Sequence, residues 1–255
     1  MTLVAALPMY DWPELRAEVD AQWVVMRDAL RAKGYDAPEV LMRRNADLPP
    51  VPGGIKDAAG NVIAPDPATL PPDELDLPTL WRHPDLLITQ TCWGPMELGL
   101  GRQVHLAGQD DYSGIEGGGG ELYSSALVAR RGEGTPVAAP IDGKARLPID
   151  LMRQKRLAVN SHDSMSGYLA LRRDLETQGE TLALFVSLVE TGGHRESIEA
   201  VASGRADMAA IDCKSWAFAQ RFDEAASALV VVGWTGRRKG LPFISSLELP
   251  AHLFA

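Results

Sequence analysis

The stretch Arg156-Leu-Ala-Val-Asn-Ser-His-Asp-Ser-Met-Ser-Gly-Tyr-Leu-Ala-Leu-Arg-Arg173 carries the clearest structural signal in this chain of 255 residues. It opens with a short apolar run, Leu157–Val159, which predicts a buried strand. Small hydroxyl, amide and glycine residues follow, and from Leu169 onward the apolar spacing is that of a helix. The segment therefore predicts a strand that turns directly into a helix.

The residues between that strand and that helix predict an anion-binding site. Ser164, Ser166 and Gly167 lie at or just before the start of the helix, where backbone N–H groups have no partner within the helix. The helix dipole adds positive charge there, and free N–H donors beside hydroxyls bind oxyanions. One serine would be an ordinary N-cap, but two serines flanking Met165 exceed what a cap needs. We therefore expect unpaired amides around Met165.

Composition and charge exclude several classes of partner. Net charge is −9, from 25 basic and 34 acidic side chains, and no strong basic cluster is present. Nucleic acid and anionic membranes need a basic surface, so neither is an expected partner. Cys92 and Cys213 do not have the spacing of metal ligands, and we predict no metal and no cofactor.

The termini and hydropathy leave the compartment open. No apolar run approaches the roughly 20 residues of a membrane span. The first residues lack the basic segment of a signal peptide. Two interpretations remain: a cytoplasmic protein, or a mature form that carries a new Met1.

Predicted strands and helices alternate along the chain, which indicates an α/β fold with mainly parallel sheets. Polar turns follow four predicted strand ends, where ligands bind in open α/β sheets, so one shared cleft is expected. Residues 45–78 form a loop rich in Pro and Gly, with a small hairpin expected around Gly60 and no assigned role. The strands are expected at 3–7, 39–43, 85–91, 104–108, 122–130, 157–159, 182–189, 207–212 and 228–234, and the main helices at 14–33, 169–173, 195–203 and 216–222.

Four segments of the sequence resemble the PhnD-like phosphate, phosphite and phosphonate substrate-binding proteins of ABC importers. They are Tyr123–Arg130, Asp163–Tyr168, Gly192–Asp207 and Ala210–Asp212. Members of that family typically carry Ser-Thr-Ser-Gly-Tyr where this chain has Ser-Met-Ser-Gly-Tyr. Met165 removes one hydroxyl but keeps its backbone N–H.

The resemblance implies a type II periplasmic-binding-protein fold, in which two α/β lobes are joined by two crossing strands and enclose a ligand cleft. The crossings are expected near Ser124–Leu127 and Ala210–Cys213. Residues 1–125 and 213–255 would then form one lobe, and residues 126–212 the other. Such proteins close around their ligand by hinge motion.

The resemblance also assigns roles to individual residues. Ser164, Ser166 and the amides of Met165 and Gly167 would hold the oxyanion. The His194 ring would donate to it, unless this residue only caps its helix or is exposed. Carboxylates beside an anion site favour a ligand that also carries an amine, and Glu190 and Asp212 are the candidates. For Asp212 the alternative is that it fixes the hinge through backbone N–H groups. The other candidate ligand contacts are Tyr10, Gln90, Thr91 and Tyr123.

The favoured function is a non-catalytic, periplasmic and monomeric binding protein. It would deliver a small anionic solute, phosphonate-like or phosphate-like and possibly carrying an amine, to the membrane permease of an ABC transporter. One alternative is a cytoplasmic small-molecule sensor of the same fold. The other is a hydrolase with Cys92 or Ser164 as nucleophile and His162 or His194 as base. The sequence has no Gly-x-Ser-x-Gly elbow, which disfavours the hydrolase.

Overall fold

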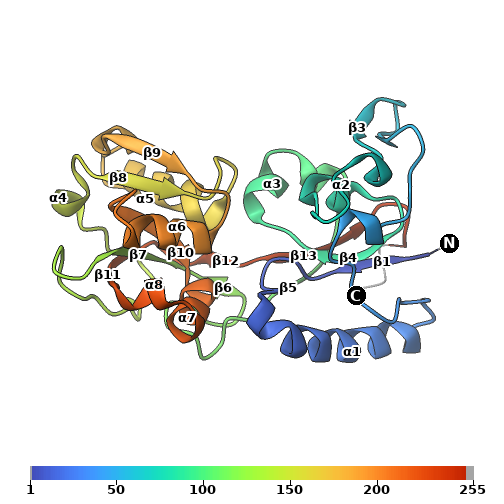
Figure 1. Ribbon diagram of the computed structural model, residues 1–255, viewed down its shortest axis with the longest axis horizontal. Helices are drawn as coiled ribbons and strands as arrows, with labels where there is room; N and C mark the ends of the chain where they lie inside the picture. Colours follow the sequence, from blue (N-terminus) through green and yellow to red (C-terminus); the bar gives the residue numbers. More distant parts are fainter. Residues whose placement is uncertain (1, 251–255) are drawn as a thin grey trace. The chain divides into compact units, whose positions relative to one another are not determined.

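The computed structural model describes residues 2–250, and the chain divides into two compact units (Figure 1). Unit 1 comprises Met1–Thr91, Pro95–Gln109 and Leu241–Ala255, and unit 2 comprises Cys92–Gly94 and Asp110–Gly240. Each unit contains its own sheet, with helices packed on it. The α/β prediction is confirmed.

Unit 1 is built on a four-stranded sheet of order β1-β4-β13-β5. Its strands are β1 (Val4–Ala6), β4 (Leu86–Gln90), β13 (Pro242–Ser246) and β5 (Val104–Gln109). β4 is buried along its whole length, as its apolar run requires. It pairs parallel with β1 and antiparallel with β13, which the sequence had not indicated as a strand.

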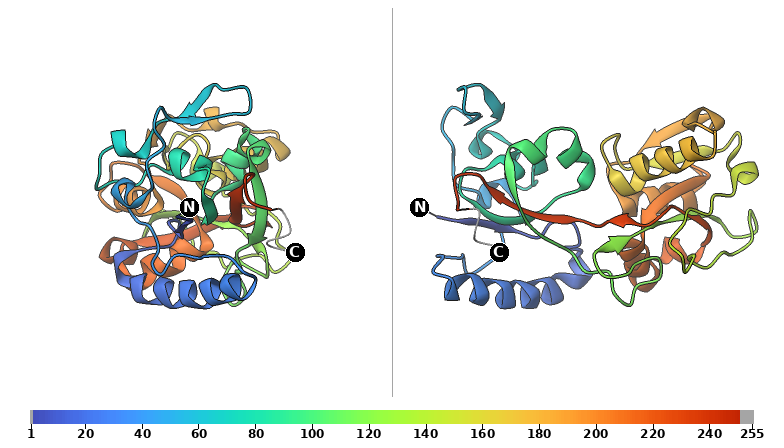
Figure 2. Two further views of the ribbon diagram at one scale, coloured as in Figure 1. Left: turned by 90° about the vertical axis from the view of Figure 1, so that its right-hand side faces the viewer. Right: turned by 180° about the vertical axis from the view of Figure 1, so that it is seen from behind.

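Helices cover both faces of the unit 1 sheet (Figures 1 and 2). The long helix α1 (Arg16–Ala32) lies along one face and buries Val19, Trp23 and Leu30, which recur on one helical stripe. The other face carries α2 (Leu77–Arg82). The shorter elements of this part of the chain are η1 (Pro13–Leu15), η2 (Asn45–Asp47), η3 (Pro67–Thr69), α3 (Trp93–Glu97) and η4 (Leu100–Arg102).

The predicted hairpin in the Pro- and Gly-rich loop is present. β2 (Ile55–Lys56) pairs antiparallel with β3 (Val62–Ala64), and Gly60 has a φ of 85° in the turn between them. The strand expected at residues 39–43 is wrong. That segment does not pair with a strand along its length. Within the described residues, its one backbone hydrogen bond to the sheet joins the Met42 N–H to the Ala5 carbonyl.

Unit 2 is built on a five-stranded sheet of order β11-β7-β10-β8-β9. The strands are β11 (Leu229–Trp234), β7 (Ser125–Arg130), β10 (Met208–Asp212), β8 (Arg156–Val159) and β9 (Ser187–Glu190). β10 pairs parallel with β8 and antiparallel with β7. Both sheets are therefore mixed, and the expectation of mainly parallel sheets is wrong.

The strands expected to cross between lobes lie instead in the middle of the unit 2 sheet. Ala126 of β7 is paired with Ile211 of β10. β11 belongs to the same sheet, and the helix after β10 packs on that sheet. Residues 110–125 and 213–240 therefore fall in unit 2. The division found by contacts thus differs from the predicted boundaries at 125/126 and 212/213.

The helices of unit 2 pack on both sides of its sheet (Figures 1 and 2). The main ones are the π-helical turn η5 (Met165–Leu169), α5 (Ala170–Thr177), α6 (His194–Ala202) and α7 (Cys213–Phe222). Shorter elements are β6 (Leu122–Tyr123), α4 (Ile149–Met152), η6 (Leu182–Leu184), α8 (Glu224–Ser227) and β12 (Arg238–Lys239). Across residues 2–250, no helix has both the length and the apolar character that a membrane crossing needs.

One buried carboxylate ties three strands of this sheet together. Asp207, next to the start of β10, accepts hydrogen bonds from the backbone N–H and the guanidinium of Arg156 on β8. It also accepts from Arg130 at the end of β7, at 3.0 Å. These donors hold the pKa of Asp207 far below its usual range, against the opposing effect of burial.

Candidate anion-binding site

The predicted strand–turn–helix is present, and Ser164 is its N-cap. After β8 ends at Val159, the Ser164 backbone is extended and its hydroxyl accepts the Gly167 N–H at 3.0 Å. The Ser164 carbonyl accepts the N–H of Leu169, five residues on, at 2.9 Å. The helix therefore opens with a π-type turn, a feature often found at functional sites.

The expectation of unpaired amides at this turn is wrong for Met165 and Gly167. Gly167 is paired as described, and the Met165 N–H donates to the sulfur of Cys92 at 3.2 Å. Ser164 is 9% exposed and Ser166 5% exposed, so the turn lies under protein atoms. Backbone N–H groups buried this deeply need a partner, and the chain itself supplies one.

The segment Cys92–Gly94, here named the cover segment, packs directly on the turn. A Cβ placed on Gly94 would lie 1.7 Å from the carbonyl oxygen of Asp163, so only glycine fits. Cys92 and Trp93 pack against a small buried cluster of Met165, Leu169 and Ala170. Sequence reasoning missed this partner because the two segments are about 70 residues apart.

Three of the predicted residues meet at one ring nitrogen. Nε2 of His194 lies 2.8 Å from the Ser166 hydroxyl oxygen and 3.2 Å from Oδ2 of Asp212. His194 begins α6, after β9, and Asp212 ends β10; β8 lies between these two strands and pairs parallel with both, so the segments that follow the three strands meet at one edge of the sheet. Burial lowers the pKa of His194, and the charges of Asp212 and Glu196 only partly oppose this. The ring is therefore neutral at pH 7 and has one hydrogen to donate.

Asp212 also caps the helix that follows it. Its Oδ1 accepts the N–H groups of Lys214 at 3.0 Å and Ser215 at 2.9 Å, which begin α7. The alternative role for Asp212, bonding to backbone N–H groups, is thus observed, but as an N-cap. Its second oxygen is the one that faces His194.

Tyr123 supplies a buried donor close to the same cluster. It is 1% exposed and stacks on Tyr112, with ring centroids 5.2 Å apart. Within the described part of the chain its hydroxyl forms no hydrogen bond of standard geometry, although the Ser166 side chain lies close enough to act on it. Burial raises the pKa of Tyr123 well above its usual value, and the negative charge of Asp212 adds to the rise, so the phenol keeps its hydrogen.

Glu190 is not part of this cluster. It ends the edge strand β9, where its side chain is exposed. Among residues 2–250 no hydrogen bond or ion pair joins it to Ser166, His194 or Asp212. The edge position explains this, because β9 has a neighbour on one side only.

Tyr10, Gln90 and Thr91 lie in unit 1, and all three are buried. Gln90, the last residue of β4, accepts the Met9 N–H with its side chain at 3.3 Å. The Thr91 hydroxyl has no partner among the described residues, while its N–H donates to the Pro242 carbonyl. Their role as ligand contacts stays a prediction.

The nucleophile hypotheses find little support in the geometry. Burial raises the pKa of the Cys92 thiol, so the sulfur is neutral at pH 7. His162 stacks edge-on against Tyr168, at 4.9 Å between ring centroids. No group of three or more His, Cys, Asp or Glu side chains that could hold a metal occurs in residues 2–250.

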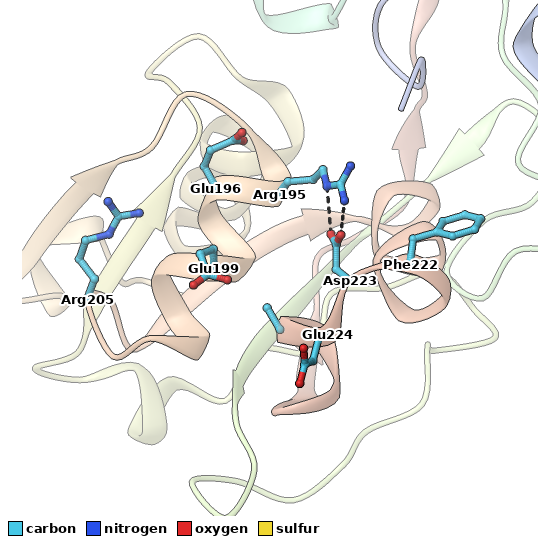
Figure 3. A pocket seen from close by; sticks show the side chains of 8 residues that line it. Arg195, Glu196, Glu199, Arg205, Phe222, Asp223 and Glu224 are labelled. Atoms are coloured by element: carbon cyan, nitrogen blue, oxygen red, sulfur yellow. Dashed lines mark hydrogen bonds and ion pairs between the residues drawn. The ribbon is translucent and has the colours of Figure 1, made fainter. Parts of the chain in front are cut away.

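A separate pocket of about 430 Å³ lies on unit 2 beside α6 and α8 (Figure 3). Arg195 bonds to Asp223 within it, and the remaining charged groups are of both signs. None of the residues predicted for the anion site lines this pocket. Its lining is Arg195, Glu196, Glu199, Arg205, Phe222, Asp223, Glu224 and Ala225.

Solved structures similar to this chain share its fold at low sequence identity. A binding-protein component of an ABC phosphonate transporter from Pseudomonas aeruginosa is 14% identical, with a TM-score of 0.58 over 98% of this chain and 70% of its own. XAC2383 from Xanthomonas citri, bound to ATP, is 17% identical, with a TM-score of 0.55 over 99% and 79%. PhnD1 from Prochlorococcus marinus, in complex with methylphosphonate, is 18% identical, with a TM-score of 0.52 over 65% of this chain.

These likenesses confirm the type II periplasmic-binding-protein fold. The match spans only 58% of the Prochlorococcus protein. No curated protein sequence matches the chain significantly. The sequence model of the phosphonate periplasmic substrate-binding proteins of ABC transporters, however, matches residues 99–255, which is more than half of the chain; the chain therefore belongs to that family.

Proposed function

We propose that this chain is a non-catalytic binding protein for a small phosphonate-like or phosphate-like anion, which it passes to the permease of an ABC transporter. The observation that carries the proposal is the Ser164–Gly167 turn at a helix start, with the Ser166 hydroxyl held against His194. Family membership supports both the class of ligand and the transporter partner.

The donors needed for an oxyanion are gathered at the turn. The Ser164 hydroxyl accepts a bond from Gly167, so its own hydrogen is available to a ligand. The neutral His194 ring and the protonated Tyr123 phenol lie close by, and the dipole of the helix from Met165 to Thr177 adds positive charge. A charged oxyanion forms stronger hydrogen bonds than the neutral thiol that now accepts from Met165.

The carboxylate of Asp212 limits which anions suit the site. A dianion beside it would be repelled, whereas a ligand that also carries an ammonium group would gain an attractive partner. The N–H groups of Lys214 and Ser215 already offset part of that negative charge. We therefore favour an aminophosphonate over bare phosphate. Glu190 remains a proposed second contact for the amine.

A hydrolase is the less favoured candidate, for a geometric reason. In a Ser–His–Asp triad the serine and the carboxylate bond to opposite nitrogens of the ring. Here Ser166 and Asp212 both approach Nε2, and Nδ1 has no partner within the described residues. The arrangement supports binding rather than proton relay. A monomer in the periplasm, without a nucleic-acid partner, completes the proposal.

Calorimetry with phosphate, phosphite, methylphosphonate and 2-aminoethylphosphonate tests this function. We expect binding heat with at least one phosphonate, and loss of that heat in the Ser164→Ala, Ser166→Ala double variant. Ser203→Ala is the matched control, because that serine caps the far end of α6 and bonds only within it. Absence of heat with all four anions, or unchanged affinity in the double variant, would refute the proposal.

A further inference from the structure

The sulfur of Cys92 lies where a bound anion would receive its first hydrogen bond. The Met165 N–H donates to it at 3.2 Å. The N–H groups of Gly94 and Ser166 also point toward the sulfur, and all three oppose the rise that burial causes in the Cys92 pKa. Successive backbone N–H groups directed at one point form an anion-binding nest. In this chain the nest holds a neutral thiol.

Two buried donor groups in this part of unit 2 lack a hydrogen bond of standard geometry. The hydroxyl of Tyr123, 1% exposed, forms no hydrogen bond of standard geometry within residues 2–250 and only approaches the Ser166 side chain, and the buried ring nitrogen of Trp93 has no partner there. A thiol is a weak acceptor and satisfies one donor poorly. Buried donors without partners cost free energy, so they indicate a missing acceptor.

A positively charged side chain also lies close to the cover segment. The Lys239 ammonium lies 5.6 Å from the centroid of the Trp93 ring. The charge of Asp163 adds to the rise in the thiol pKa. Asp163 bonds to the Ser161 hydroxyl, which partly disperses that charge.

We propose that Cys92 is a tethered stand-in for the ligand: its sulfur occupies the anion nest when no ligand is bound, and an incoming anion displaces it. This inference rests on the proposed function and adds a residue that sets the affinity. The thiol accepts the hydrogen bond of the Met165 N–H, so this donor is satisfied and the turn stays folded without ligand. Because the thiol is neutral, a charged oxyanion replaces it at low cost.

Two substitutions of similar size test the proposal. Cys92→Asp puts a tethered carboxylate in the nest, and Cys92→Asn puts a neutral amide there. With methylphosphonate as the probe, we expect Cys92→Asp to bind at least about tenfold more weakly than Cys92→Asn. At pH 7 Cys92→Asp should also unfold at a higher temperature than Cys92→Asn, and the difference should decline as the pH falls below about 4, toward the lower pKa that the carboxylate has in the folded protein. Equal affinities for the two variants would overturn the proposal.

The thermal comparison separates this proposal from the function on which it rests. If the wild-type protein binds none of the anions, the proposed function fails, and a pH-dependent stabilisation by Cys92→Asp still supports the tethered occupant. If the wild-type protein binds and the two variants do not differ, only the tethered occupant fails.

Cys92→Ala gives an independent measurement should Cys92→Asp not fold. Removing the sulfur leaves the Met165 N–H without its acceptor, so its hydrogen exchange, followed by NMR without ligand, should become faster. Cys213→Ala is the matched control, because Cys213 is also buried and its N–H bonds to the Ser124 carbonyl. Unchanged exchange at Met165 in Cys92→Ala would count against the proposal.

Discussion

Ser166 and His194 are joined through a contact of 2.8 Å between the serine hydroxyl oxygen and Nε2 of the ring, although 28 residues separate them in sequence. Asp212 approaches the same nitrogen at 3.2 Å. A neutral imidazole carries one hydrogen, on Nδ1 or on Nε2, and in the Nε2–H tautomer it can donate to only one of these oxygens at a time. A bound oxyanion can therefore accept this hydrogen bond in place of Ser166 or Asp212.

His194→Gln should weaken anion binding by roughly tenfold, because a glutamine amide donates less well placed hydrogen bonds than the ring. Calorimetry with methylphosphonate measures this. His105→Gln, at a half-buried position on β5 of unit 1, is the control and should bind as the wild-type protein does.

The same residue should make stability depend on pH. Because the pKa of His194 in the folded chain is below its unfolded value of about 6.5, the unfolded state binds the extra proton first. The stabilisation is complete above pH 6.5 and is lost as the pH falls through the lower, folded value. Thermal unfolding from pH 8 to pH 5 should show this loss for the wild-type protein and a smaller one for His194→Gln. Parallel curves for the two proteins would contradict the assignment.

Tyr123→Phe should separate stability from binding. Within residues 2–250 its hydroxyl forms no hydrogen bond of standard geometry and only approaches the Ser166 side chain, so removing it should leave the free energy of unfolding unchanged or raise it by about 1 kcal/mol. Affinity for a phosphonate should fall, because a donor is lost. Urea denaturation and calorimetry on one preparation measure both. A clear loss of stability would show that the phenol already has a structural partner.

Gly94→Ala should destabilise the protein by about 1–3 kcal/mol or more, because the added methyl group meets the Asp163 carbonyl. Gly119→Ala is the control, since a Cβ there would come no closer than 3.7 Å to the Arg237 side chain and the backbone φ is not positive. Denaturant unfolding distinguishes the two variants. Equal stability would mean that the cover segment can move away from the turn without cost.

Asp207→Asn should lower the free energy of unfolding at pH 7 by about 2–3 kcal/mol, because charge-assisted bonds to Arg156 and Arg130 are lost. The depressed pKa of Asp207 means that its contribution is present above pH 4 and declines as the pH falls further. Acid unfolding of the wild-type protein should therefore be steeper than that of Asp207→Asn. Asp150→Asn is an exposed control, expected to change little.

Local pattern was enough for most elements and for the chemistry of the turn. The apolar runs of β4 and β8, the cap at Ser164 and the hairpin around Gly60 are determined by nearby residues, so the sequence could predict them. Other features depend on contacts between residues far apart in the chain. They are the direction of strand pairing, the pairing of β13 with β4 and β5, and the packing of the cover segment. For the same reason the amide of Met165 was expected to be free, although Cys92 accepts from it.

The single extra residue in the π-type turn constrains how this protein can change over evolutionary time. Leu169 bonds back to Ser164, and the helix beyond it places Leu171 and Leu175 in the core of unit 2. Deleting one residue of the turn would rotate every later side chain by about 100° and pull both leucines out of that core. Substitution of side chains in this turn can therefore change the ligand preference during evolution. Insertions and deletions in the turn would disrupt the core and be selected against.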